Sequence, residues 1–278
     1  MDLSVIKPSS NLKDIVKNYV VVKSLDEYEK LWVLPGAGNF ILFNPGLEAY
    51  LHKYNSDEMM FTLPTAFSIG VKANDIVRFK VEKDDDIRYP LLAVELMPTG
   101  FNRLFNKNAY DLRSGHVLLS ECIKDMDISF SALYSLGSVD EQIAYIEKRL
   151  LFLKEKPVPL HVESIFIIIE EIIQYMLDTL LNVNVATILE KFDYSRTSLE
   201  RDFKRIVGYT PKEFIQMMRF CSIFKELIEN GYDYRKLKYE FFDQSHMNKT
   251  FKKFIDIPPS KLQDYILANK IQIYQTHE

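Results

Sequence analysis

The strongest constraint on this chain is an internal repeat near its C-terminal end, in which two segments align at an offset of 48 residues. The aligned pairs share residue class and position: Leu189 and Leu237, Tyr194 and Phe242, Ser195 and Asp243, Leu199 and Met247, Phe203 and Phe251, Ile206 and Phe254, and Pro211 and Pro259. An internal repeat is evidence about architecture before any motif is named. The chain is therefore predicted to contain two copies of one helical unit.

Each copy is predicted to be a short helix, a tight turn and a second helix. The turn falls at Phe192-Asp193-Tyr194 in the first copy and at Phe241-Phe242 in the second. Ser195 or Asp243 then caps the next helix, whose apolar residues at i, i+4 and i+7 form one inward stripe. Everything after about position 161 is predicted to be helical.

The face opposite each stripe is polar and basic. In the first copy it carries Thr197, Arg201 and Lys204, with Arg205 at the flank and Glu200 at the edge. In the second copy it carries Ser245, Lys249 and Lys252, with Lys253 beside them and Asn248 at the edge. A basic face on one helix alone can be explained as a surface that is simply exposed to solvent. Matching cations in two copies favour contact with DNA, because phosphates need cations and base edges need hydrogen-bonding groups.

The charge distribution supports this interpretation. From Asn182 onward there are 16 lysines and arginines against 13 aspartates and glutamates, whereas the preceding residues hold 19 against 26. An acidic front half joined to a basic C-terminal part is the balance expected of a two-part sensor and DNA binder.

The repeat resembles the AraC/XylS family of transcription regulators. The residues that carry the resemblance are Ser195 to Phe203, Val207-Gly208, Pro211 to Phe214 and Arg219-Phe220 in the first copy, and Phe242 to His246, Phe251 and Pro258 to Ser260 in the second. The resemblance covers about 165 to 268 and implies two helix-turn-helix units joined by a long helix at about 211 to 230. It also implies that each second helix enters a major groove, the two grooves lying one turn, roughly 34 Å, apart.

The DNA-binding residues expected from the faces and the resemblance form one set. They are Arg196, Thr197, Glu200, Arg201, Lys204, Arg205, Gln244, Ser245, His246, Asn248, Lys249, Lys252 and Lys253. For His246, capping or packing is the alternative to a DNA contact.

The second copy departs from the family pattern. Phe241 replaces the turn glycine, Leu237 replaces a small core residue, and Asp256 stands where the first copy has Gly208. A bulky residue at positive φ is an outlier. We therefore expect the first unit to determine which DNA sequence is bound, through Thr197, Glu200 and Arg201. The second unit is expected to contact mostly the DNA backbone.

The front half predicts an α+β chain, with a β-rich domain ahead of the all-α domain. Val77, Phe79 and Val81 alternate with charged residues, as in a half-buried strand. Turn signals at 36–38 and 84–86 adjoin the apolar runs 40–43 and 91–94. These features predict a small barrel or cupin-like domain over residues 1–155, ending in helices. The double helix-turn-helix domain is predicted at 161–270.

A helix and a boundary follow the predicted strands. Ser138 and Glu141 form a capping-box pattern, and Ile143, Ile146, Leu150 and Leu153 follow at helical spacing. The polar, proline-containing segment 155–159 ends that helix and marks the boundary.

The front half also resembles, more loosely, a β-rich sensor domain found in part of the same family. The matching pieces are Leu34-Pro35-Gly36, Ile41 to Asn44 and Val94 to Gly100. The resemblance implies a small-molecule effector or a homodimer as partners, in addition to promoter DNA.

Enzyme motifs are missing from the sequence. It contains no HExxH, GxSxG, P-loop or CxxC, and its five histidines have no metal-ligand spacing. Glu170 and Glu171 are adjacent on a predicted helix, so they do not face each other and are expected on a solvated surface. We expect no enzyme activity, metal or cofactor.

The expected compartment is the cytoplasm, without a membrane span. The most apolar stretch, 165–181, is interrupted by Glu170, Glu171 and Asp178 and predicts a buried amphipathic helix. Met1 to Ser4 do not resemble a signal peptide.

The favoured hypothesis is a sequence-specific DNA-binding transcription regulator with a sensing front domain. One alternative is a protein-interaction module with a degenerate second helix-turn-helix. The weakest alternative is a DNA-modifying enzyme whose catalytic part is the front domain.

Overall fold

The computed structural model describes residues 2–24, 30–33, 39–45, 49–53, 59–62, 66–70, 77–81, 90–114, 116–122, 129–179, 182–233, 236–237, 244–269 and 271–274. The predicted turns at 36–38 and 84–86, the motif Leu34-Pro35-Gly36, and Phe241 to Asp243 lie outside these residues. The same is true of the side chains of Gln244, Ser245 and His246, although their backbone is helical.

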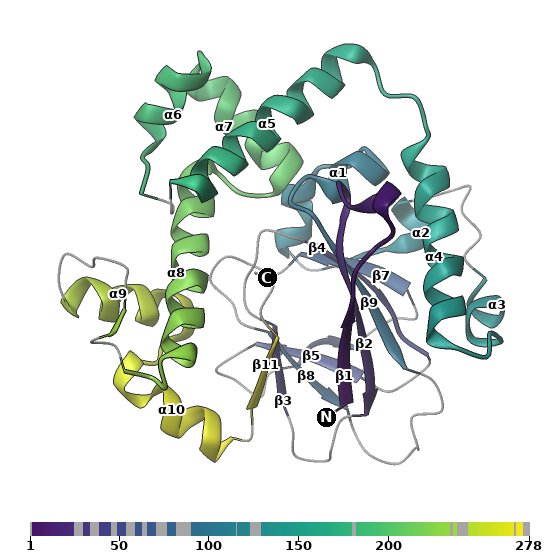
Figure 1. Cartoon of the computed structure of the whole chain (residues 1–278), viewed down its shortest axis with the longest axis horizontal. Helices are drawn as coiled ribbons and strands as arrows, with labels where there is room; N and C mark the ends of the chain where they lie inside the picture. Colours follow the sequence, from purple (N-terminus) through teal and green to yellow (C-terminus); the bar gives the residue numbers. More distant parts are fainter. Residues whose placement is uncertain are drawn as a thin grey trace.

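The described strands form two sheets (Figure 1). The first has the order β1 (Asp2–Ile6), β2 (Val16–Ser24), β9 (Leu91–Leu96), β4 (Asn39–Phe43), β7 (Ala66–Gly70) and β10 (His116–Leu118). The second has the order β11 (Ile271–Tyr274), β3 (Lys30–Val33), β8 (Val77–Val81), β5 (Ala49–Lys53) and β6 (Met59–Thr62). The expected β-rich front domain is confirmed, and the apolar runs 40–43 and 91–94 lie in its buried strands β4 and β9.

Short helices and the longer α4 pack against the first sheet in one hydrophobic core. They are η1 (Ser10–Leu12), α1 (Gly100–Phe105), η2 (Ala109–Ser114), α2 (Leu119–Cys122), α3 (Phe130–Tyr134) and α4 (Val139–Lys154). The predicted cap of α4 is present, since Ser138 Oγ accepts from the Glu141 N–H at 3.2 Å. The return bond of the capping box is shifted by one residue, because the Glu141 carboxylate accepts from the Gly137 N–H at 3.0 Å. Its apolar residues, Ile143 to Leu153, pack into one core with Ile41, Phe43 and Val94 of the sheet.

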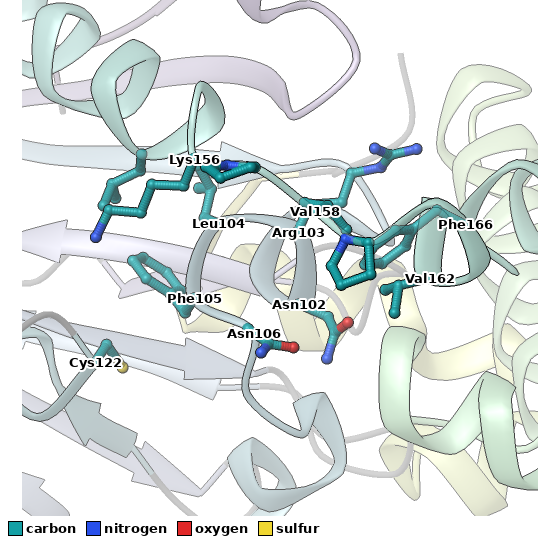
Figure 2. A pocket seen from close by; sticks show the side chains of 13 residues that line it. Asn102, Arg103, Leu104, Phe105, Asn106, Cys122, Lys156, Val158, Val162 and Phe166 are labelled. Atoms are coloured by element: carbon teal, nitrogen blue, oxygen red, sulfur yellow. The ribbon is translucent and has the colours of Figure 1, made fainter. Parts of the chain in front are cut away.

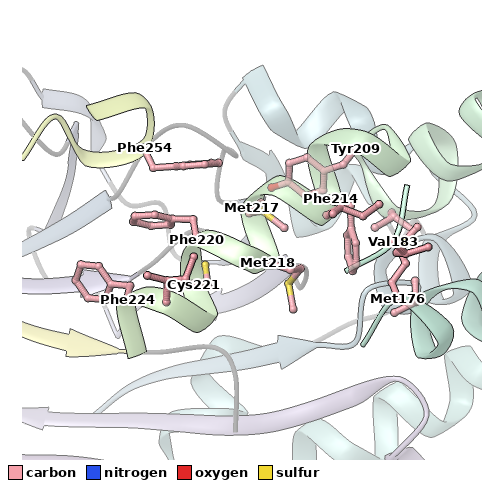
Figure 3. Packing of buried hydrophobic residues seen from close by; sticks show 14 of the residues in the cluster. Met176, Val183, Tyr209, Phe214, Met217, Met218, Phe220, Cys221, Phe224 and Phe254 are labelled. Atoms are coloured by element: carbon pink, nitrogen blue, oxygen red, sulfur yellow. The ribbon is translucent and has the colours of Figure 1, made fainter. Parts of the chain in front are cut away.

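The helical part consists of α5 (Leu160–Asp178), α6 (Val185–Phe192), α7 (Arg196–Val207), α8 (Pro211–Glu229), α9 (Gln244–Ile255) and α10 (Pro259–Ala268). These helices share a second core, centred on α8 (Figure 3). The two cores contain different residues, and the segment 155–159 between α4 and α5 separates them in sequence. We call the elements from β1 to α4 the front part and those from α5 to α10 the helical part.

Strand β11 corrects the prediction that everything after 161 is helical. Residues Ile271–Tyr274 pair in parallel with Lys30–Val33 of β3, so the chain leaves the helical part and joins a sheet of the front part. Sequence pattern did not reveal this strand, because its partner lies at the other end of the chain.

Helix α5 confirms the amphipathic interpretation of the apolar stretch over its described residues, with Phe166, Ile169, Ile172 and Met176 all buried. Within the described part of the chain, no helix combines the length and the apolar character that crossing a bilayer requires. Glu171 is exposed as expected. The Glu170 side chain is 38% exposed, and it also accepts hydrogen bonds from Thr99 at 2.7 Å and Arg103 at 2.9 Å, which were not predicted.

Candidate DNA interface

The first unit is a short helix, a left-handed turn residue and a capped second helix. Asn184 caps α6 by accepting from the Thr187 N–H at 3.0 Å. Asp193 follows the last residue of this helix, inside the predicted turn, and its φ of 48° lies in the left-handed region. Ser195 then caps α7 by accepting from the Ser198 N–H at 3.1 Å. The turn therefore fixes the direction in which α7 leaves α6.

Helix α7 is anchored by one apolar face. Leu199, Phe203 and Ile206 are completely buried, as predicted. The Phe203 ring meets the Phe214 ring of α8 edge to face, with 5.4 Å between centroids. With this side fixed, the exposed side carries Arg196, Thr197 and Arg201, and Glu200 is half-buried at its edge.

Arg201 is held in place by a buried carboxylate that the sequence analysis missed. Its guanidinium donates to both Asp202 oxygens, at 3.0 and 3.1 Å, and the hydrogen bond to Asp202 raises the pKa of Arg201. Asp202 also accepts from the Tyr194 hydroxyl at 2.9 Å. Burial, followed by this hydrogen bond, raises the pKa of Tyr194 to about 12, so the hydroxyl remains a donor at neutral pH. The available signal was an aspartate beside the apolar stripe, since a buried carboxylate requires partners.

Two of the predicted residues lie at the junction with the front part. The Lys204 amine is 5.8 Å from the centroid of the Tyr110 ring, which belongs to η2. The backbone carbonyl of Arg205 accepts from the Asn102 amide of α1 at 3.3 Å. The last turn of α7 thus contacts the front part, while its first two turns are free of these contacts.

The second unit repeats the first at the same offset of 48 residues. Helices α7 and α9 have equal length, and α8 and α10 both begin with proline at equivalent positions. Asp256 has φ 51° where Gly208 has φ 90°, so the aspartate reproduces the left-handed helix end. The predicted departure at this position therefore leaves the helix geometry unchanged.

Helix α9 buries its stripe and exposes its cations. Met247, Phe251 and Phe254 are buried, and the Phe254 ring stacks on Phe220 of α8 at 4.7 Å between centroids (Figure 3). The exposed residues of this helix with described side chains are Asn248, Lys249, Lys252 and Lys253. Of these, Lys253 donates to the Gln216 side chain of α8 at 2.7 Å.

Helix α8 separates the two units. Thr210 and Glu213 form a reciprocal capping box at its start, and Pro211 occupies the first turn. Its 19 residues extend over about 28 Å. In Figure 1 this helix runs from the α5–α7 group to α9 and α10, so it carries both units on one rigid element.

Among the described residues, no three His, Cys, Asp or Glu side chains are close enough to hold a metal ion. Burial raises the pKa of both thiols, Cys122 to about 11, which keeps them protonated at neutral pH. Neither is an activated nucleophile.

Comparison with known proteins identifies the repeated region. Residues 188–265, from α6 to α10, match a family model described as a helix-turn-helix domain. The chain is 33% identical over 96 residues to the HTH-type transcriptional activator AarP of Providencia stuartii, a match that covers 34% of this chain and 71% of that protein. It is 29% identical over 98 residues to the multiple antibiotic resistance protein MarA of Escherichia coli strain K12, covering 34% and 77%.

Solved structures of ToxT from Vibrio cholerae are similar over most of the chain. One structure gives a TM-score of 0.45 at 13% identity, covering 96% of this chain and 97% of that chain. A structure of ToxT from strain O395 gives a TM-score of 0.43 at 13% identity, covering 100% and 98%.

Proposed function

The chain belongs to the AraC/XylS family of transcription regulators, and from this premise we propose how it recognises DNA. It is a sequence-specific DNA-binding regulator. Helices α7 and α9 enter successive major grooves of one duplex, with α7 reading bases and α9 mainly fixing the register on phosphates. The observation that carries this proposal is the repeat of a buried stripe and an exposed basic face at a constant offset.

The different roles of the two helices are supported by their side chains. Arg201 is restrained by Asp202, and a restrained guanidinium suits bidentate contact with a guanine edge. Lys249 and Lys252 are exposed point charges, which suit phosphates. We assign the remaining predicted residues, Arg196, Thr197, Glu200, Lys204, Arg205, Gln244, Ser245, His246, Asn248 and Lys253, to the surrounding interface.

The front part is proposed to act as a sensor that influences α7 and α8. Arg113 of η2 pairs with Glu213 of α8 at 3.1 Å, and Asn102 of α1 bonds to the end of α7. A change in the front part that alters these contacts would alter the position of the first unit. We retain residues 1–155 and 161–270 as the proposed domains, with β11 as an addition that returns to the first.

The rival function, a protein-interaction module with a degenerate second unit, is disfavoured by the intact packing of α9. A unit that no longer bound DNA would be under no constraint to keep Lys249 and Lys252 at the positions of Arg201 and Lys204.

The test is selection of bound duplexes from a random-sequence library, followed by titration of the selected duplex at several salt concentrations. The full chain should bind with a steep negative slope of affinity against salt, because neutralised phosphates release counterions. Replacing Arg201, Lys204, Lys249 and Lys252 with alanine should weaken binding and flatten the slope. An unchanged affinity and slope in the folded variant would contradict the proposed interface.

A further inference from the structure

A tyrosine of the front part lies at one end of the exposed stripe of α7. Thr197, Arg201 and Lys204 follow one another at i, i+4 and i+7, so they share one side of that helix. The Lys204 amine, at the C-terminal end of the stripe, is 5.8 Å from the centroid of the Tyr110 ring in η2. The stripe that we propose to enter a major groove therefore continues onto the front part.

The Tyr110 side chain is open to solvent, and cations lie beside its ring. The residue is 43% exposed. In addition to Lys204, the Arg113 guanidinium lies 5.1 Å from the ring centroid, and Arg113 is itself held by Glu213 of α8 at 3.1 Å. Attraction between a cation and an aromatic face restrains the ring. None of the hydrogen bonds among the described residues uses the Tyr110 hydroxyl, which leaves that donor open to a partner.

Hydrogen bonds tie η2 to the end of α7. The Asn102 amide of α1 donates to the carbonyl of Lys107, just before η2, at 2.5 Å and to the carbonyl of Arg205 in α7 at 3.3 Å. Asn102 is labelled in Figure 2, among the residues that line a pocket of about 450 Å³. The Tyr110 N–H donates to the Asn108 side chain at 3.1 Å. Tyr110 is therefore held in a defined position relative to α7.

The chemistry around Tyr110 suits a phosphate. Sugar–phosphate strands border a major groove on both sides, and tyrosine hydroxyls are among the groups that donate to phosphate oxygens. Lys204 and Arg113, which flank the ring, favour an anion at the same place. The acid of η2, Asp111, accepts from the Asn108 amide at 3.2 Å. Because Tyr110 lies beside the end of α7 and not on it, its hydroxyl is placed for the border of the groove and not for the base edges inside it.

We propose that the front part contacts DNA directly, through a hydrogen bond from the Tyr110 hydroxyl to a phosphate beside the major groove that α7 enters. The inference rests on the proposed function and adds a residue outside the helix-turn-helix units to the DNA interface. A displacement of η2 would weaken DNA binding without any change in α7. Bound DNA would in turn favour the undisplaced position of η2, because coupling acts equally in both directions.

The first test removes the hydroxyl and keeps the ring. Tyr110→Phe should bind the selected duplex roughly three- to tenfold more weakly, because one hydrogen bond is lost. The loss should be equal for all single-base variants of the duplex, since a phosphate carries no sequence information. Parent-like binding by Tyr110→Phe, or a loss confined to particular base pairs, would overturn the proposal.

The matched control is a tyrosine of α4 that also lies beside an arginine. The Arg149 guanidinium is 3.3 Å from the centroid of the Tyr145 ring. Figure 1 shows α4 well away from α7. Tyr145→Phe should therefore bind the duplex with the affinity of the parent chain, and an equal loss in both variants would refute a specific role for Tyr110.

The second test places a cation at the same position. Tyr110→Lys supplies a charge for the same phosphate, so the slope of log affinity against log salt should steepen by about 0.9. Ala144→Lys adds the same charge at an exposed position of α4 and should leave the slope unchanged. Circular dichroism checks that both variants are folded. An unchanged slope in folded Tyr110→Lys would place this residue away from the phosphates and refute the proposal.

Ethylation interference identifies the phosphate itself. Ethylation removes the charge of a phosphate and weakens binding wherever the protein contacts it. One phosphate beside the α7 site should be sensitive in the parent chain and insensitive in Tyr110→Phe. Identical interference patterns for the two chains would contradict the assigned hydrogen bond.

The same titrations separate this inference from the proposed function. If alanine at Arg201, Lys204, Lys249 and Lys252 lowers affinity and slope while both Tyr110 variants behave like the parent chain, the interface of α7 and α9 stands and the front part does not belong to it. A parent chain that selects no duplex contradicts both.

Discussion

Arg201 and Asp202 show how a neighbouring residue can orient a side chain that we propose to read a base. The aspartate is buried and is itself fixed by the Tyr194 hydroxyl, while the arginine side chain is 67% exposed. Two of the guanidinium nitrogens donate hydrogen bonds to Asp202, so the guanidinium is already oriented in the absence of DNA. Preorganisation of this kind reduces the rotamer entropy lost on binding.

Single substitutions should distinguish side chains that contact bases from side chains that contact phosphates. Arg201→Ala should relax base preference at one or two positions, by about 1–3 kcal/mol each, whereas Lys249→Ala should weaken binding to all sequences alike. Both are measured against a panel of single-base variants of the selected duplex. If Lys249→Ala is the variant that relaxes base preference, the assigned roles of α7 and α9 are reversed.

Phe203 tests the anchoring of the recognition helix. The ring is fully buried against Phe214, so Phe203→Ala should lower the free energy of unfolding by about 3–5 kcal/mol. Thr197→Ala, on the exposed face of the same helix, should change it by less than about 0.5 kcal/mol. Urea denaturation of both variants gives the comparison, and similar small losses would show that the stripe is not an anchor.

At the scale of elements, the end of α7 is a close-packed joint between the two parts. Gly208 has φ 90°, and a Cβ built on it would lie 3.0 Å from the backbone oxygen of Ala109 in η2. Glycine therefore serves both the left-handed helix end and the close approach of the front part. Asp256 meets the first requirement in α9 with φ 51°.

Gly208→Ala should cost more stability than its backbone conformation alone explains. The matched control is Gly231→Ala, where φ is 65° and no atom lies within 4 Å of the added Cβ. The control should lose roughly 1–2 kcal/mol from left-handed strain, and Gly208→Ala should lose more because Ala109 must move. If thermal or urea unfolding gives equal losses of stability for the two variants, the backbone at Ala109 moves away from the added Cβ at no measurable cost.

The elements also show what the sequence can predict. The helices and their faces were predictable because a 3.6-residue period is a local property, and β4, β8 and β9 followed from local runs. Strand β11 was not predictable from the sequence, because Ile271–Tyr274 become a strand only through pairing with β3. The same limit applied at the proposed DNA interface. The exposed side of α7 was predicted, but the contacts of Lys204 with Tyr110 and of Arg205 with Asn102 depend on the front part.

Across the whole molecule, polar bonds join the front part to the helical part. Arg103 links α1 to two glutamates of α5, and Arg113 links η2 to Glu213 at the start of α8. Partial burial by itself would raise the pKa of Glu213. The hydrogen bonds from Thr210 and the charge of Arg113 outweigh it and hold that pKa below its usual range.

This pKa predicts an acid-sensitive joint. A carboxylate whose pKa is lowered on folding stabilises the folded state above the unfolded-state pKa, and this contribution disappears as pH falls through the lowered value. Glu213→Gln should therefore be less stable than the parent chain at pH 7, and the difference should shrink toward pH 3. Urea unfolding at the two pH values measures it. The control, Glu171→Gln on the exposed face of α5, should show no such convergence, and a constant deficit in Glu213→Gln would rule out this ion pair as the acid-sensitive group.

The return of β11 to β3 bears on how the molecule is made. During synthesis Lys30–Val33 leave the ribosome long before Ile271–Tyr274. The edge of β3 that pairs with β11 therefore stays unpaired until the whole helical part has emerged. The remaining strands of that sheet come from the first part of the chain and need no such wait. A polypeptide interrupted within the helical part would carry an unpaired edge on β3, and unpaired strand edges promote aggregation. Strand β11 thus covers an edge of β3 that stays open until residues 271–274 have been made.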